Sequence, residues 1–133
     1  MTQFHQLVAI IAALALVIFA IAQIIRPNIL AKSKWIFPAA LSVAFTIWSL
    51  IAVATEGPTG FWPEHVKHFW GNQIWFDLLL AVGVAWFFIA PQARKLGMNL
   101  WFWLAFTLCS GSIGLLAMVS RLLYLQATQN QKS

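Results

Sequence analysis

The chain has 133 residues, of which 62% are hydrophobic and only 8% are charged. A soluble domain carries about 25% charged residues, so this chain has too few charges to cover a water-facing surface, and a lipid bilayer is its expected surroundings. Its net charge is +5, and most of its basic residues lie in short segments between apolar runs. This distribution argues against nucleic-acid binding and is typical of the positive-inside rule.

Four apolar runs follow one another along the chain, at residues 7–25, 35–55, 74–90 and 100–123. A helix of about 20 apolar residues crosses the hydrocarbon core of a membrane, which is roughly 30 Å thick. The predicted fold class is therefore all-α. We expect one membrane domain over residues 1–125, an up-down bundle of four transmembrane helices, followed by a polar tail at 126–133.

Proline and glycine mark the expected ends of these helices. Pro27 follows the first run, Pro58 follows the second, and Pro91 is expected to end the third, because proline cannot donate a backbone hydrogen bond. Gly97 is expected in the turn before the fourth. The first six residues hold no lysine or arginine, so the first run is predicted to be a retained membrane helix rather than a signal peptide.

The basic residues set the expected orientation. Segments 26–34 and 91–99 together hold five lysines and arginines, whereas the other side would hold three, Lys67, Arg121 and Lys132. The positive-inside rule then predicts that both segments face the cytoplasm and that both termini lie on the outer side. All three acidic residues and all three histidines fall on the predicted outer side.

Residues 63–77, PEHVKHFWGNQIWFD, hold a candidate metal site. His65 and His68 are three residues apart, and Glu64 and His68 are four apart, spacings that bring side chains to one face of a helix. An amphipathic turn over residues 62–70 explains the same pattern without a metal, with tryptophans facing lipid and histidines facing water. A stable metal site needs three or four ligands, so the amphipathic turn is the preferred interpretation.

Asp77 is the candidate functional residue within a span. We expect it about 5 Å inside the third helix, where an ionisable group is costly unless it is paired or lines a cavity. Arg121, near the outer end of the predicted fourth helix, is its predicted partner in an ion pair that clamps the two helices together. In the alternative interpretation both line an outward-facing pocket with Asn72 and Tyr124.

No motif in the chain names a reaction. The spans contain no lysine, no central histidine and no chain of acidic residues, and the sequence has no glycine-rich phosphate loop. The single cysteine, Cys109, is interpreted as a packing residue. Enzymatic activity is therefore not favoured, and no cofactor is indicated.

Residues 77–125 carry a family resemblance. An aspartate opens one helix at Asp77, a charged turn runs from Arg94 to Met98, and the last helix has Gly111 and Gly114 at its centre and a terminal Leu-Tyr-Leu. This half of the chain resembles an uncharacterised family of small bacterial membrane proteins. It is also similar to the four-helix membrane proteins linked to neoxanthin formation. Those proteins usually carry Gly-Pro-x-Gly where this chain has Gly-Ser-Ile-Gly. The resemblance implies a bacterial inner-membrane location.

Three functions are compatible with these features. The first is an accessory subunit or assembly factor of a larger membrane complex, with the bilayer and other membrane proteins as partners. The second is binding or conversion of a lipophilic molecule, such as an isoprenoid, carotenoid or quinone, near Asp77. The third is a small oligomeric transporter. The small size, the very short loops and the lack of a reactive constellation favour the first.

Overall fold

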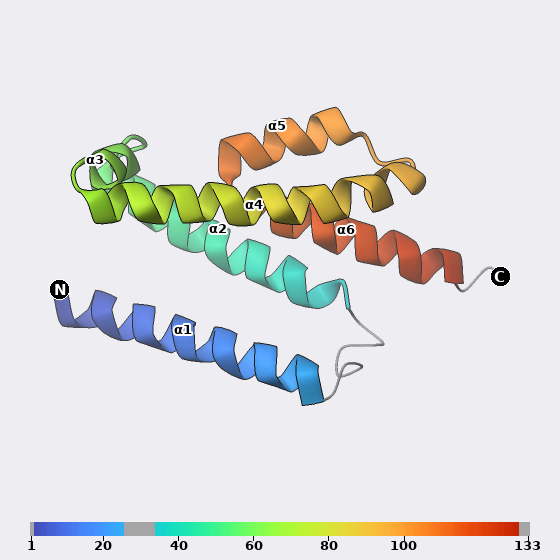
Figure 1. Cartoon of the computed structure of the whole chain (residues 1–133), viewed down its shortest axis with the longest axis horizontal. Helices are drawn as coiled ribbons and strands as arrows, with labels where there is room; N and C mark the ends of the chain where they lie inside the picture. The colour runs from blue at the N-terminus through green and yellow to red at the C-terminus, as the bar shows by residue number, and fades with distance from the viewer. Residues whose placement is uncertain (1, 26–33, 131–133) are drawn as a thin grey trace. The chain divides into compact units, whose positions relative to one another are not determined.

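The computed structural model describes residues 2–25 and 34–130, and every regular element in them is a helix (Figure 1). Three of these helices are long and apolar enough to cross a bilayer, at Gln3–Ile25, Ile36–Glu56 and Phe69–Lys95. The prediction of an all-α protein with membrane-spanning helices is therefore confirmed for the described residues.

Helix α1 (Thr2–Ile25) belongs to a compact unit of its own, Met1–Ser33, and is described here by itself. It contains no charged residue, and apolar side chains occupy all of its faces. A helix that is hydrophobic all round is typical of a membrane span. The run predicted at residues 7–25 forms the greater part of this helix.

The second unit, Lys34–Ser133, begins with three helices that follow the predicted pattern. In α2 (Ile36–Glu56), Pro38 lies in the first turn, where a missing N–H has no helical partner to lose. Gly57 ends α2 with a φ of 84°. A short helix, α3 (Phe61–Val66), then leads into α4 (Phe69–Lys95), which extends beyond both ends of the predicted run 74–90.

Pro91 does not end α4, contrary to the prediction, because it lies four residues before the end of the helix. The fixed φ of proline suits a helix, and its ring removes only the backbone bond to the Phe87 carbonyl. The helix ends instead in a Schellman turn. There the N–H of Gly97, at φ 72°, bonds to the Arg94 carbonyl at 3.0 Å, and the N–H of Met98 bonds to the Ala93 carbonyl at 3.0 Å.

The fourth apolar run, predicted as one span over 100–123, is two helices. Asn99 caps α5 (Leu100–Ser110) by accepting bonds from two backbone N–H groups. Gly111, with φ 59° and ψ −127°, then reverses the chain, and α6 (Ser112–Asn130) runs back alongside α5 (Figure 1). This backbone conformation suits glycine and not residues with a Cβ. Helix α5 is about 16 Å long, half of what a span needs.

The predicted polar tail is shorter than expected. Residues 126–130 continue α6 to Asn130, and the remainder of the tail lies outside the described residues. The Thr128 hydroxyl donates to the Tyr124 carbonyl at 3.0 Å within this last stretch. The polar composition therefore marks where α6 leaves the apolar core rather than where helical structure stops.

Helix α6 packs antiparallel to α2 and completes the core of the second unit. The Ser42 hydroxyl donates to the Ile113 carbonyl at 3.0 Å, and the Ser120 hydroxyl donates to the Trp35 carbonyl at 2.9 Å. The buried hydrophobic residues of the described chain are Ala93, Met118 and Leu122, with α4 and α5 side chains around them. The core thus lies where α4, α5 and α6 meet, near the Schellman turn.

Candidate functional site

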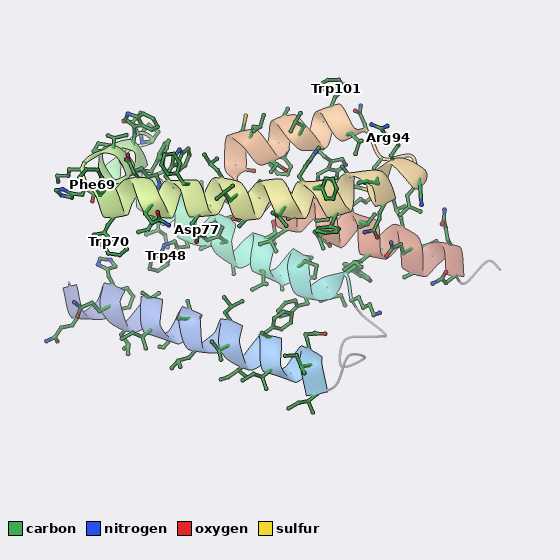
Figure 2. All side chains as sticks on the ribbon, viewed as in Figure 1. Trp48, Phe69, Trp70, Asp77, Arg94 and Trp101 are labelled. Carbon is green, nitrogen blue, oxygen red and sulfur yellow. The ribbon has the colours of Figure 1, made fainter. Side chains whose placement is uncertain are left out.

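Asp77 lies on α4, between an aromatic end that begins at Phe69 and a basic end that carries Arg94 and Lys95. It comes eight residues after Phe69, about 12 Å along the helix, and 18 residues before Lys95, about 27 Å from the basic end. Figure 2 shows it on the part of α4 that also carries Trp70, with Arg94 at the other end. If Arg94 and Lys95 mark one surface of a core roughly 30 Å thick, Asp77 lies just inside the opposite surface.

The Asp77 side chain is exposed and has no partner among residues 34–130, the described part of the second unit. No hydrogen bond to the Asp77 carboxylate is formed by these residues. Among the described residues of the second unit, the ion pair is Lys67–Glu64, whose charged atoms are 3.9 Å apart and well exposed. Such a pair adds little stability at a water-facing surface. A bare carboxylate inside a span differs, because lipid offers it no hydrogen-bond donor.

An aromatic cluster covers the start of α4 near Asp77. The rings of Phe61, Trp62 and His65 surround Trp75, with centroid distances of 6.3, 6.4 and 5.0 Å. The Asn72 side-chain amide donates to the His65 carbonyl, and Gly71 packs tightly against the Glu64 carbonyl, so α3 lies close on α4. We call Phe61, Trp62, His65 and Trp75 the α3 aromatic cluster. It covers one side of the start of α4.

The three candidate metal ligands are used in other ways. His65 packs on Trp75, Glu64 pairs with Lys67, and His68 takes an extended conformation as the residue before α4. Among the described residues no group of three or more histidine, cysteine, aspartate or glutamate side chains is placed to hold a metal ion. The amphipathic turn differs in detail from the prediction, because His65 is half-buried against a ring rather than turned to water.

Arg121 and Tyr124 lie far from Asp77, at the opposite end of the second unit. Next to Arg121, Ser120 bonds to the Trp35 carbonyl, and the Tyr124 ring meets the Trp35 ring edge-on at 5.6 Å. The Arg121 guanidinium lies 5.7 Å from the Tyr124 ring centre, a cation–π distance.

The predicted Asp77–Arg121 pair is not formed, and the four proposed pocket residues do not share a pocket. The reason is the reversal at Gly111, since residues after it run back towards the start of α2 instead of onward to the α3 end. Asn72 and Asp77 stay at the α3 end, while Arg121 and Tyr124 join Lys34, Arg94 and Lys95 at what we call the basic end.

The polar contacts at the tip of the α5–α6 hairpin were not predicted from the sequence. Ser42 is 8% exposed and bonds to α6, while Thr107 is 3% exposed and its hydroxyl has no partner among the described residues. A Cβ on Gly114 would come within 2.8 Å of the Thr107 backbone. The available signal was Ser-Gly-Ser at 110–112, which interrupts an otherwise apolar run.

No protein-family model, curated protein or solved structure matches this chain. Within the described residues the structure contains one carboxylate on a helix long and apolar enough to span a membrane, an aromatic cluster beside it, and a helical hairpin, α5–α6, that begins and ends at the basic end.

Proposed function

We propose that this chain is an accessory subunit or assembly factor of a larger complex in the bacterial inner membrane. The observation that carries the proposal is Asp77, an exposed and unpartnered carboxylate on α4. Lipid tails cannot solvate such a group, so polar residues inside spans face a bundle interior, a water-filled cavity or a partner. Among the described residues of the second unit, no helix supplies a donor to it. A helix of another protein can.

The packing of the second unit supports the same proposal. Three hydrophobic residues are buried in the described chain, and none of them lies in the most apolar stretch of α4. Ile74, Leu80 and Val84, which share the face of α4 that carries Asp77, are largely exposed. Lipid alone can cover an exposed apolar face. An apolar face with a carboxylate at its centre is better suited to contact with a helix of another protein that carries a lysine, arginine or hydroxyl donor.

The membrane topology we infer has three spans and one re-entrant hairpin. Helices α1, α2 and α4 cross the bilayer, while α5 enters it from the basic end and α6 returns to the same side. This arrangement is preferred to four spans, because irregular backbone within a membrane is tolerated when protein covers it, and α2 and α4 pack against the α5–α6 hairpin. The N-terminus then lies outside and the C-terminus inside.

The charges favour this topology over the predicted one. With α6 returning to the basic end, one side holds seven basic residues by their place in the sequence, Arg26, Lys32, Lys34, Arg94, Lys95, Arg121 and Lys132, and the other holds Lys67. The four-span arrangement would divide them five to three. A division of seven to one fits the positive-inside rule far better.

The test of the proposed function is gentle extraction from the native host, followed by native electrophoresis and identification of co-migrating proteins. We expect the chain to migrate with other membrane proteins in fixed proportion. Asp77→Asn should weaken the association at least tenfold, because it removes the charge while keeping the shape. Glu56→Gln, which neutralises an exposed carboxylate at the end of α2, is the matched control and should leave the complex intact.

Two results would overturn the proposal. One is a chain that migrates alone from gently solubilised membranes. The other is a non-protein lipophile, such as an isoprenoid or quinone, that co-purifies with the chain and is lost in Asp77→Asn. The second result would assign the carboxylate to ligand binding instead.

A further inference from the structure

The basic end of α4 carries a shallow hollow of about 680 Å³. Three rings, Trp86, Phe87 and Phe88, line its apolar part, and Pro91, Arg94 and Lys95 line the part nearer the helix end. Its volume lies in the range of ordinary small-molecule sites. Because the lining comes from α4, the hollow belongs to one rigid element and does not depend on how the two units are placed.

The hollow lies on the side of α4 that the hairpin does not cover. Ala93 is fully buried on the core side, whereas Phe87 and Phe88 are 72% and 64% exposed. Phe87, Pro91 and Arg94 follow one another at spacings of four and three residues, so they share one face. Pro91 has no N–H, so the Phe87 carbonyl lacks its helical hydrogen-bond partner. This free carbonyl lies where the apolar part of the face meets the basic part.

The two cations of the hollow are not neutralised by the chain. Within the described residues neither Arg94 nor Lys95 forms an ion pair, and the ion pair there lies at the α3 end. All three acidic residues lie at or towards that end, and Asp77 is 17 residues from Arg94, about 25 Å along the helix. That separation exceeds the Debye length of about 8 Å at physiological salt.

We propose that this α4 hollow binds the headgroup of an anionic phospholipid. Arg94 and Lys95 hold the phosphate, since a guanidinium fits phosphate oxygens bidentately and an ammonium adds a point charge. An acyl chain lies along Phe87 and Phe88 and continues down the apolar face of α4. Basic pockets at the ends of spanning helices are suited to such headgroups. The aromatic wall is what selects a lipid over free phosphate.

The experiment compares lipids on the purified full-length protein by native mass spectrometry and by thermal unfolding in detergent. Phosphatidylglycerol is titrated against phosphatidylcholine at equal mole fractions. We expect one retained phosphatidylglycerol, a raised Tm, and at least tenfold weaker binding in R94Q/K95Q. The matched control is K34Q/R121Q, which removes the same charge from the same end but outside the hollow. It should bind within twofold of the unaltered protein.

Two further readouts do not depend on the double variants. Added salt should weaken phosphatidylglycerol binding to the unaltered protein, and F87A should weaken it at constant charge. Equal losses in the two double variants would overturn the proposal in favour of diffuse attraction by net charge. Equal binding of phosphatidylcholine would overturn it as well. Competition by inorganic phosphate at millimolar concentration would assign the site to free phosphate.

Discussion

At the scale of single residues, glycine decides the course of this chain more than its charged residues do. Gly97 and Gly111 both have positive φ and lie at helix ends, and at Gly111 the hydropathy of the sequence gives no warning. Gly114 acts through size instead, because it lets α5 approach α6 at the level of Thr107. Small residues at such crossings are how membrane helices pack without a hydrophobic driving force.

Gly114→Ala should destabilise the protein. Its new Cβ would lie 2.8 Å from the N and Cα atoms of Thr107, which are backbone atoms and cannot turn aside. Overpacking of this kind costs about 1–3 kcal/mol, and we expect a Tm in detergent several degrees lower. Gly83→Ala is the control, since a Cβ at Gly83 meets no atom within 4 Å. A Tm for Gly114→Ala equal to or above that of Gly83→Ala would contradict the close approach.

At the scale of elements, the sequence predicts a helix well and its direction poorly. The runs that became α1, α2 and α4 were visible because about 20 apolar residues in a row admit few other structures. The run at 100–123 has the same composition, yet Gly111 divides it, and glycine is also tolerated inside continuous membrane helices. That Asp77 lies within a long apolar helix was therefore predictable from the sequence. The partner of Asp77 was not predictable. Whether Arg121 lies at the same level of the bundle as Asp77 depends on the backbone conformation of Gly111, which the sequence does not reveal.

Spin labels can distinguish the hairpin from one continuous helix. In a Cys109→Ser background, labels at Trp101→Cys and Tyr124→Cys should lie within about 20 Å of each other, because adjacent helices pack 8–10 Å apart. A single helix would place these positions about 35 Å apart. The control pair is Phe69→Cys and Gln92→Cys, which has the same separation of 23 residues within α4 and should give the long distance. A long distance for both pairs would contradict the hairpin.

At the scale of the whole molecule, charge is sorted by end. The basic end carries Lys34, Arg94, Lys95 and Arg121 among the described residues, and the α3 end carries Glu56, Glu64 and Lys67. In the proposed topology this sorting orients the protein, and it separates the two proposed contacts. The proposed lipid site lies on α4 at the basic end, and the proposed contact with a partner protein lies at Asp77, near the α3 end.

Reporter fusions test the orientation. Green fluorescent protein fused after Ser133 should fluoresce, and alkaline phosphatase fused there should be inactive, because the inferred topology places the C-terminus in the cytoplasm. Fusions within residues 57–60 should give the opposite pair of results, since that turn lies at the α3 end. An active phosphatase at the C-terminus would restore the four-span arrangement and place Arg121 on the outer side.

The hairpin has a consequence for the order in which the protein is assembled. During synthesis, α2 and α4 emerge and enter the bilayer before α6 exists, yet α6 provides the main contacts of α2, through Ser42 and Trp35. The insertion machinery therefore meets residues 100–110 as an apolar segment too short to cross, with nothing yet to hold it. Only the arrival of α6 secures it, so the last 19 residues of helix, Ser112–Asn130, complete a fold whose spans are already in place.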